Sequence, residues 1–464
     1  MPCLPCDNLL LWFPLPCRHA VDLLLQPALW PFFRFFLALL VRTRLLRRIG
    51  PRSAPPQPEV LEASGPPKCI FPPPAGEGPP VQDYGSYRIP ALLQLGGALR
   101  DVVLALAEGR GASKLDWGRI DLVLRRSTDG GASWGPLTVV ASGEAVGLPG
   151  ATVGNPCACW DEQRQRVLLT FTVTEAGASE PAVWCRAAPP RRVFATVSDD
   201  GGVSWRTPRD IGAQASLSDW TWYATGPGRA VQLRCREHAG RIVVPCDHVR
   251  TSGCGGPVGV CCLDFKLRSH VIFSDDGGES WHIGGCGPEG TNECQLVELR
   301  DGSLLLNMRD FTGRCCRRVA VSRDGGASFD DLGHQEALPE PLPAGCQASV
   351  LAVPGGPLLF SCPADPGGQR CDLQVRGSWD EGQSWPTAVR IHGSLAAYSC
   401  LELLRAAGGG AAEVAVLFEA GSADSGAYES ISLCRVPLSE FAARGQQAEA
   451  AAGESAPLMR AGQA

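Results

Sequence analysis

Short apolar runs of strand length recur along the chain and alternate with segments rich in glycine, serine and aspartate. Runs of about four to eight residues, rich in β-branched and aromatic side chains and bounded by turn residues, are typical of β-strands. We predict strands over residues 121–125, 167–173, 241–245, 303–307 and 414–418. The pattern therefore favours an all-β fold built from many short strands.

Five copies of one eight-residue pattern, Ser-x-Asp-x-Gly-x-x-Trp/Phe, separate these runs, and we call each copy a box. The boxes occupy residues 127–134, 198–205, 274–281, 322–329 and 378–385. An Asp-Gly dipeptide within the first four is a strong signal for a tight hairpin turn. The aspartate can accept backbone N–H bonds, the glycine can adopt positive φ, and the aromatic ring can pack beneath the hairpin. Each box therefore predicts a hairpin that is stabilised by contacts among its own residues.

The spacing of the boxes predicts how the strands are organised. Their starts lie 71, 76, 48 and 56 residues apart, which is too irregular for a stacked solenoid. Repeated antiparallel units with insertions of different length fit this spacing better, and a β-propeller is such a fold. We predict a six-bladed β-propeller over residues 83–441, with roughly 60 residues in each blade.

Composition agrees with one large β-rich domain. The chain has 55 glycines and 39 prolines but only 3 methionines, as expected of short strands joined by turns. A chain of 464 residues with 44% hydrophobic residues can form a large core without disulfides. Its 21 cysteines are scattered and odd in number, so we expect free thiols and a reducing compartment.

A metal site near the middle of the chain is the alternative use of these cysteines. The candidates are Cys246, His248, Cys254, Cys261 and Cys262. Their spacing matches no common zinc pattern, and buried free cysteine is the simpler interpretation. We therefore predict no metal.

The ends of the chain differ from its body. Residues 23–41 are almost wholly apolar, arginines at positions 42, 44, 47, 48 and 52 follow them, and a Pro-rich linker covers residues 53–82. We predict that residues 1–52 form a targeting or membrane-association segment. Because Pro27, Pro31 and Arg34 weaken a spanning helix, an interfacial segment, a cleaved signal and a helix packed on the domain stay open. Residues 442–464, rich in Ala, Gly and Glu, predict a disordered tail.

Net charge excludes one class of partner. The formal charge is −6, the isoelectric point is near 5.7, and no basic stripe interleaved with aromatic residues runs through the body of the chain. We therefore expect no nucleic acid partner.

The segment Tyr87-Arg88-Ile89-Pro90, ahead of five boxes of this form, resembles the exo-α-sialidases (neuraminidases). The resemblance is strongest to the branch of animal cytosolic and ganglioside sialidases, and it covers about residues 83–441. The boxes alone do not determine function, because they are structural turns that also occur in propellers without enzymatic activity. The residues between the boxes carry the specificity.

Sialoside chemistry indicates which residues to seek. The substrate carries a carboxylate on its anomeric carbon, and arginine pairs with a carboxylate through two parallel hydrogen bonds. A carboxylate nucleophile would be repelled by that charge, and sialidases use a tyrosine instead. A glutamate is then needed to take the phenolic proton, and a separate acid must protonate the leaving oxygen.

The resemblance implies three catalytic residues. Asp116 is the acid/base, nine residues before Arg125; Asp121 is its rival because the segment after Glu108 is one residue longer than in the animal enzymes. Glu293, in Asn-Glu-Cys-Gln, is the partner that activates the tyrosine. Tyr398, in Ala-Tyr-Ser-Cys-Leu, is the nucleophile.

The resemblance also implies an arginine clamp for the substrate carboxylate. Its members are Arg88, Arg309 in Leu-Asn-Met-Arg, and Arg370 in Gln-Arg-Cys-Asp-Leu, with Arg376 as a rival to Arg370. Glu419, in Leu-Phe-Glu-Ala, is expected to orient Arg88. These residues and the catalytic ones occur in the family's order and interleave correctly with the boxes.

Secondary positions around the sugar are also implied. Arg110 and Glu175 resemble residues near the sugar's carboxylate and its glycerol or N-acyl groups, and Asn155 lies in a segment similar to one near the family's pocket. After Val243-Val244-Pro245 the animal enzymes carry tyrosines, where this chain has Cys246-Asp247-His248. The substrate preference within the family therefore stays open.

These features together predict an exo-α-sialidase that acts on terminal α-linked sialic acids of glycolipids, glycoproteins or oligosaccharides, with retention of configuration and without a cofactor. A trans-sialidase, or a sialidase for a deaminated nonulosonic acid, is the alternative among enzymes. A catalytically inactive propeller that binds glycans or proteins is the alternative in another class. Membrane-associated, cytoplasmic and endolysosomal locations all stay open.

Overall fold

The computed structural model describes residues 58–72, 84–111, 114–251, 265–341, 344–365, 368–405, 411–424 and 426–441. The predicted segment 1–52, half of the predicted linker 53–82 and the tail 442–464 lie outside the described residues, and the described half of the linker contains two strands of the domain, residues 60–62 and 68–71. Strands dominate the described part, and its helices are short: η1 (Gly97–Leu99), α4 (Glu180–Trp184), α5 (Gly212–Ala215) and η2 (Arg236–His238). None of these described helices has the length and apolar character needed to cross a bilayer.

The first half of the chain forms two sheets. The nine-stranded sheet contains β3 (Ser86–Gln94), β4 (Val103–Arg110), β5 (Ile120–Ser127), β6 (Thr138–Ala141), β7 (Thr152–Asp161), β8 (Arg166–Thr174), β9 (Arg192–Ser198), β10 (Arg209–Asp210) and β12 (Gly228–Arg229). The five-stranded sheet contains β11 (Trp220–Thr225), β13 (Val231–Gln232), β14 (Ile242–Thr251), β15 (Phe265–Ser274) and β16 (His282–Glu289). The strands predicted over 121–125, 167–173 and 241–245 are confirmed as parts of β5, β8 and β14.

Residues 291–437, together with two strands from the start of the described chain, form two further sheets. The four-stranded sheet contains β17 (Thr291–Glu298), β18 (Leu304–Asp310), β19 (Cys316–Ser322) and β20 (Asp330–Pro339). The eight-stranded sheet contains β1 (Val60–Glu62), β2 (Lys68–Phe71), β21 (Ser349–Ala352), β22 (Leu358–Pro363), β23 (Cys371–Ser378), β24 (Thr387–Leu404), β25 (Glu413–Ser422) and β26 (Gly426–Pro437). The predicted strands 303–307 and 414–418 fall in β18 and β25.

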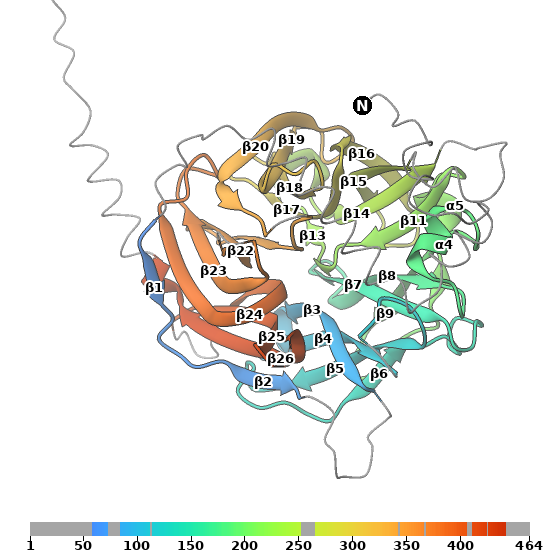
Figure 1. Cartoon of the computed structure of the whole chain (residues 1–464), viewed down its shortest axis with the longest axis horizontal. Coiled ribbons are helices and arrows are strands. Elements are labelled where there is room, and N and C mark those ends of the chain that lie inside the picture. The colour runs from blue at the N-terminus through green and yellow to red at the C-terminus, as the bar shows by residue number, and fades with distance from the viewer. Residues whose placement is uncertain are drawn as a thin grey trace, which may run out of the picture.

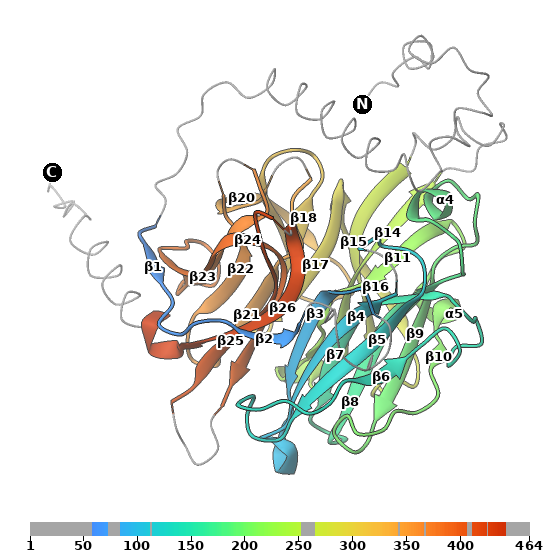
Figure 2. The same cartoon turned by 60° about the horizontal axis from the view of Figure 1, so that its bottom comes forward.

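The sheets are arranged around a common centre, with the chain passing from one sheet to the next (Figure 1). Strand β2, from the start of the described chain, pairs antiparallel with β26, from its end. In Figure 2 these two strands lie beside β3 and β4. The pairing joins the two ends of the domain, so the ring closes through backbone hydrogen bonds.

Apolar side chains fill the space where the strands face one another. One cluster includes Leu104, Leu124 and Phe171, all of which are fully buried. Burial of each such side chain contributes roughly 1.5–3 kcal/mol relative to its exposed state. Packing of this kind holds the strands in fixed positions, which a site built from several strands requires.

The boxes fold as the sequence predicts. In the first box, Ser127 Oγ donates to Asp129 Oδ1 over 2.7 Å and accepts from the backbone N–H of Gly131 over 2.8 Å. Asp129 Oδ1 also accepts from the backbone N–H of Ser133. All five boxes repeat these contacts, and the glycine at the fifth position of each box has φ between +88° and +98°. The seventh residue is always a serine whose hydroxyl donates to the aspartate, a regularity that the predicted pattern lacked.

The aromatic residue that ends each box is buried to different degrees. Trp281 and Trp385 are 3% and 4% exposed, whereas Trp134, Trp205 and Phe329 are partly buried and pack against neighbouring clusters. The rings therefore join the apolar core, fully in two boxes and in part in three.

Fourteen of the fifteen described cysteines carry free thiols, but Cys185 is disulfide-bonded, so the expectation of free thiols is wrong at this position. Within the described residues no group of three or more His, Cys, Asp or Glu side chains could hold a metal ion. Cys246 is fully buried and His248 stacks on Trp220, with 3.7 Å between ring centroids. The other three residues of the zinc alternative, Cys254, Cys261 and Cys262, lie outside the described residues.

Candidate active site

Three of the predicted site residues lie at interruptions of strand pairing. The pairing register of β3, β17 and β24 shifts between residues 88 and 91, 291 and 294, and 396 and 399. Such irregularities re-aim side chains and are common beside active sites. Glu293 and Tyr398 fall within two of these shifts, and Arg88 is the last regularly paired residue before the third, so each lies where its strand leaves the regular alternation.

A cavity of about 160 Å³, which we call the front cavity, collects most of the predicted residues. It is lined by Arg88, Lys114, Leu115, Asp116, Arg309, Arg370, Tyr398 and Tyr428. The predicted clamp arginines, acid and nucleophile are therefore brought together from parts of the chain up to about 300 residues apart.

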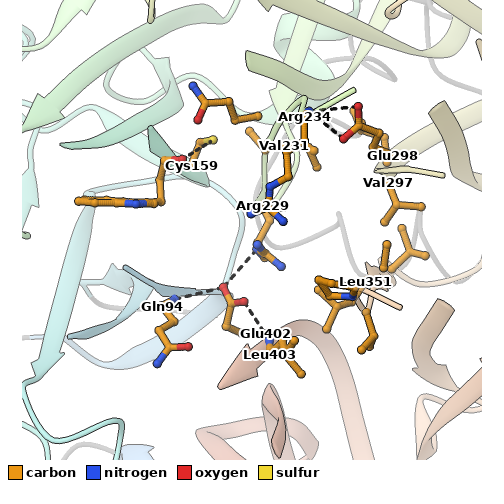
Figure 3. Close-up of a pocket in the computed structure, with 18 of the residues that line it drawn as sticks. Gln94, Cys159, Arg229, Val231, Arg234, Val297, Glu298, Leu351, Glu402 and Leu403 are labelled. Carbon is orange, nitrogen blue, oxygen red and sulfur yellow. Dashed lines mark hydrogen bonds and ion pairs between the residues drawn. The ribbon is translucent and has the colours of Figure 1, made fainter. Parts of the chain in front are cut away.

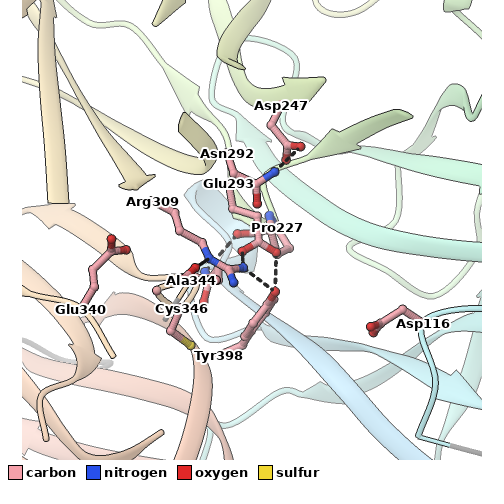
Figure 4. A network of polar contacts seen from close by, with 12 residues as sticks. Asp116, Pro227, Asp247, Asn292, Glu293, Arg309, Glu340, Ala344, Cys346 and Tyr398 are labelled. Carbon is pink, nitrogen blue, oxygen red and sulfur yellow. Dashed lines mark hydrogen bonds and ion pairs between the residues drawn. The ribbon is translucent and has the colours of Figure 1, made fainter. Parts of the chain in front are cut away.

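The Tyr398 hydroxyl donates a hydrogen bond to the Glu293 carboxylate (Figure 4). The Tyr398 Oη to Glu293 Oε1 distance is 2.5 Å, and Arg309 Nη1 donates to Glu293 Oε2 over 2.6 Å and to Tyr398 Oη over 3.3 Å. All three side chains are more than nine-tenths buried. Burial, followed by the Glu293 carboxylate, raises the pKa of Tyr398 well above its usual value, while three arginines oppose the shift. The phenol is therefore protonated when the cavity is empty, with its acceptor already in place.

Glu419 fixes Arg88. Its two oxygens accept from Arg88 Nε over 2.9 Å and from Arg88 Nη2 over 3.3 Å. They also accept from the backbone N–H groups of Ile89 and Tyr398, at 2.9 and 3.1 Å. Burial lowers the pKa of Arg88, but the Glu419 carboxylate and nearby groups raise it well above its usual value. The structure thus places Glu419 in the orienting position that the sequence predicted.

Tyr428 lines the cavity although sequence reasoning did not select it. Its hydroxyl accepts from Arg370 Nη1 over 2.9 Å, and the Arg88 guanidinium lies 4.0 Å from its ring centroid. Arg370 Nη2 also donates to the carbonyl of Gly345 over 3.2 Å. Tyr428 therefore contacts two of the predicted clamp arginines at once, and only its rarity as one of 5 tyrosines marked it in the sequence.

Asp116 reaches the front cavity from the loop after β4 and lies apart from the tyrosine network (Figure 4). Its Oδ1 accepts from Arg88 Nη1 over 3.0 Å and from Arg110 Nη1 over 2.9 Å, and its side chain is 26% exposed. Arg110 is held by Glu108, which accepts from its Nε and Nη2 at 3.1 and 2.5 Å. Glu108 also accepts from the backbone N–H of Asn155, so Arg110 and Asn155 both support this edge of the site.

Asp121 and Arg376, the alternative candidates for the acid and the third arginine, lie outside the front cavity. Asp121 is buried and accepts from the Tyr84 hydroxyl over 2.8 Å, and Arg376 donates to the carbonyl of Ala337 over 2.8 Å. Neither lines the front cavity, whereas Asp116 and Arg370 do. Glu175 is exposed just after β8 and does not line this cavity in the ligand-free protein.

Asp247, in the segment that departs from the animal enzymes, lies behind Glu293. Its Oδ2 accepts from Asn292 Nδ2 over 2.9 Å, and its Oδ1 is buried without a hydrogen-bond partner among the described atoms. Burial, and next the nearby Glu293 carboxylate, raise the pKa of Asp247 well above its usual value. A protonated Asp247 would avoid placing a second buried negative charge near Glu293.

Comparison with known proteins identifies the family. The family profile described as "BNR repeat-like domain" matches residues 104–410. Sialidase-3 of Rattus norvegicus is 31% identical over 326 residues, which cover 66% of this chain and 74% of the rat protein. The chain belongs to the sialidase family. Sialidase-3 of Homo sapiens is 34% identical over 279 residues, and the sialidase of Micromonospora viridifaciens is 31% identical over 339 residues. Those two matches cover 58% and 70% of this chain, and 61% and 49% of the relatives.

Solved structures agree with the sialidase assignment. The Hadza microbial sialidase Hz136 has a TM-score of 0.65 and 27% identity, with 77% of this chain and 67% of that chain covered. Trypanosoma rangeli sialidase in complex with 2,3-difluorosialic acid has a TM-score of 0.64 and covers 87% of this chain and 64% of that one. Its 18% identity indicates a shared fold only. The all-β fold predicted from the boxes is confirmed.

Proposed function

We propose that this sialidase hydrolyses terminal α-linked sialic acids from glycolipids, glycoproteins or oligosaccharides, with retention of configuration, through a tyrosyl-enzyme intermediate. The observation that carries the proposal is the 2.5 Å contact between Tyr398 Oη and Glu293 Oε1 at the wall of a cavity lined by three arginines. A buried tyrosine with its own acceptor suits a substrate whose negative charge would repel a carboxylate nucleophile.

Arg88, Arg309 and Arg370 would hold the substrate carboxylate. Each is largely buried or packed against an aromatic ring, and each lines the same small cavity. Removed from bulk water, guanidinium groups interact strongly with an anion and need little reorganisation to do so. Because Glu419, Glu293 and Tyr428 already fix their orientations, the clamp is formed before the substrate arrives.

In the first step, Tyr398 Oη would attack the anomeric carbon while Glu293 takes the phenolic proton. The bond from that carbon to the leaving oxygen breaks with its electron pair, and Asp116 donates a proton to this oxygen. Asp116 is paired with Arg88 over 3.0 Å and with Arg110 over 2.9 Å. A substrate carboxylate that binds Arg88 would compete with Asp116 for this guanidinium, and Asp116 would keep its contact with Arg110 while it carries the proton.

In the second step, water would displace the tyrosine. Asp116 takes a proton from the water as its oxygen attacks the anomeric carbon, and the departing phenolate recovers its proton from Glu293. Two successive displacements at one carbon give overall retention. All of these steps use side chains of the chain itself, and the proposal includes no cofactor.

The proposal includes six propeller blades. Strand pairing supports six groups: β3–β6, β7–β10, β11 with β14–β16, β17–β20, β21–β24, and β24–β26 with β2. Strand β24 is shared, because its residues 387–395 pair with β23 and its residues 396–404 pair with β25. A strand shared in this way explains why two groups merge into one eight-stranded sheet.

The proposal also covers location. Residues 1–52, with an apolar run and five arginines behind it, would associate the sialidase with a membrane or direct it to an organelle. Sialylated glycoconjugates presented at membranes, such as gangliosides, would then be accessible to the front cavity.

The decisive test is Tyr398→Phe with trapping of the intermediate. The change removes one oxygen, so the fold should survive while release of a fluorescent aglycone from a sialoside falls by several orders of magnitude. A fluorinated sialyl fluoride should label Tyr398 in the unaltered protein, as mapped by mass spectrometry. Tyr84→Phe is the matched control, because it removes a hydroxyl that bonds Asp121 outside the cavity. A label on another residue, or full activity in Tyr398→Phe, would contradict the mechanism.

The arginine assignment has its own test. Arg370→Ala should weaken binding of an unsaturated sialic acid analogue by about 2–5 kcal/mol, because one partner of a buried charge pair is lost. Arg376→Ala should leave affinity unchanged, since its guanidinium bonds the carbonyl of Ala337 away from the cavity. Binding of the analogue without release of any aglycone would favour the inactive glycan-binding alternative, and transfer to an added acceptor sugar would favour a trans-sialidase.

A further inference from the structure

A second and larger cavity, which we call the rear cavity, lies on the central axis of the ring. It measures about 1110 Å³ and is lined by residues of β3, β7, β13, β17, β21 and β24 (Figure 3). It shares none of its described lining residues with the front cavity. The strands β3, β17 and β24 that carry Arg88, Glu293 and Tyr398 thus run on to line it.

Two buried glutamines bond to the backbone beside the rear cavity, and one of them, Gln295, lines it. Gln347 Nε2 donates to the carbonyls of Ser399 and Pro227, at 3.0 and 3.3 Å, and Gln295 Nε2 donates to Pro227 over 3.0 Å. Both glutamines are almost fully buried. Because the two cavities share no described lining residue, we treat the rear cavity as a separate space.

Arg229 projects into the middle of the rear cavity (Figure 3). Its Nε lies 3.3 Å from Glu402 Oε2, and the two side chains are 23% and 6% exposed. This ion pair lacks the alignment of a hydrogen bond, and Arg229 Nε is buried without a hydrogen-bond partner among the described atoms. Glu402 is itself fastened, since its oxygens accept from the backbone N–H groups of Gln94 and Leu403 at 3.1 and 2.9 Å.

This arrangement repeats the one that orients Arg88 in the front cavity. In both places a buried glutamate accepts from two backbone N–H groups and pairs with the Nε side of an arginine. In the front cavity Arg88 Nη2 also bonds Glu419 and Nη1 reaches Asp116, whereas Arg229 pairs with Glu402 through Nε and its terminal nitrogens are left for the rear cavity. A guanidinium held in this way is prepared to bind a planar carboxylate through two hydrogen bonds.

The rest of the lining indicates what accompanies the carboxylate. The charged lining residues are five arginines and four glutamates, and Glu298 accepts from the backbone N–H groups of Arg234 and Cys235. Apolar side chains stand on two sides of Arg229 in Figure 3, among them Val231, Val297 and Leu351. An inorganic anion gains no binding free energy from contact with apolar side chains, whereas the hydrocarbon part of an organic anion does gain it.

We propose that the rear cavity is a binding site for a small organic carboxylate, with Arg229 as its anchor and the apolar inner-strand side chains around its carbon body. The site is independent of the sialidase reaction, because its lining and its arginine are distinct from those of the front cavity.

Calorimetric titration of the full chain with 3-phenylpropionate tests this proposal. Two further probes separate charge from shape: 3-phenylpropanamide has the same body without the charge, and inorganic phosphate has the charge without the body. Arg229→Met should weaken 3-phenylpropionate binding on the order of tenfold or more, since hydrogen bonds to a charged group are lost. Arg229→Lys keeps the charge but not the fork, so it should give an intermediate affinity.

Arg309→Met is the matched control, because it removes an anion-binding arginine from the front cavity only. Rear-cavity binding should persist in this variant. Circular dichroism melting of each variant shows that it is folded, and Arg229→Lys reports on the site should Arg229→Met unfold. Absence of binding, equal binding of the amide, or binding lost in Arg309→Met but kept in Arg229→Met would overturn the proposal.

Discussion

Glu419 is the residue on which both halves of the front cavity depend, and Glu419→Gln measures that dependence. The carboxylate is fully buried and joins Arg88 on β3 to the backbone of Tyr398 on β24. Removing one partner of a buried ion pair costs about 3–5 kcal/mol, because the other charge stays buried without compensation. Asp116 still contacts Arg88 at 3.0 Å, and a glutamine carbonyl can accept one of the two backbone bonds. We therefore expect a loss near the lower limit, about 3 kcal/mol.

Urea unfolding measures the loss in free energy of unfolding caused by Glu419→Gln. Steady-state kinetics with a fluorescent sialoside measure the effect of the same change on the active site. KM should rise and kcat should fall, since the change releases Arg88 and the backbone that positions Tyr398. Glu62→Gln is the control, because Glu62 pairs with Arg390 on the surface at 70% exposure, where such pairs contribute at most about 1 kcal/mol. If Glu419→Gln were as stable and as active as Glu62→Gln, the orienting role assigned to Glu419 would be wrong.

Three further predictions concern the boxes and the N-terminus. Trp281→Ala should lower the free energy of unfolding by about 3–5 kcal/mol without changing turnover per folded molecule, and lost turnover at unchanged melting temperature would refute its structural role. Burial raises the pKa values of Asp200 and Asp276, but the hydrogen bonds within their boxes outweigh it and lower both values to about 2. The stability that these ionised aspartates provide above about pH 4 should therefore be lost as the pH falls towards 2, as measured by urea unfolding at each pH. Deleting residues 1–52 should shift the protein from the membrane to the soluble fraction; identical partition would exclude an anchor.

The amino-acid sequence by itself determined the hairpins, and its resemblance to a family indicated which residues to expect at the candidate active site. A box folds through contacts between residues two and four positions apart, such as Ser127 with Asp129 and Gly131, so its turn chemistry is visible in eight letters. Asp116, Glu293 and Tyr398 lie within short segments whose order along the chain resembles the family. For these features local sequence was enough, because the information that specifies them is local.

Only the tertiary structure decided what lies together around the two cavities. Arg88 and Glu419 are 331 residues apart. No local sequence pattern predicts that Tyr428 lies beside two arginines or that Arg229 lines the rear cavity. Arg370 and Arg376 are chemically identical and six positions apart, yet only Arg370 reaches the front cavity. Register shifts in β3, β17 and β24 aim the site residues, and they depend on pairing with neighbouring strands. Contacts of this kind form only when strands that are distant in the sequence pack together, so they could not be predicted from local sequence.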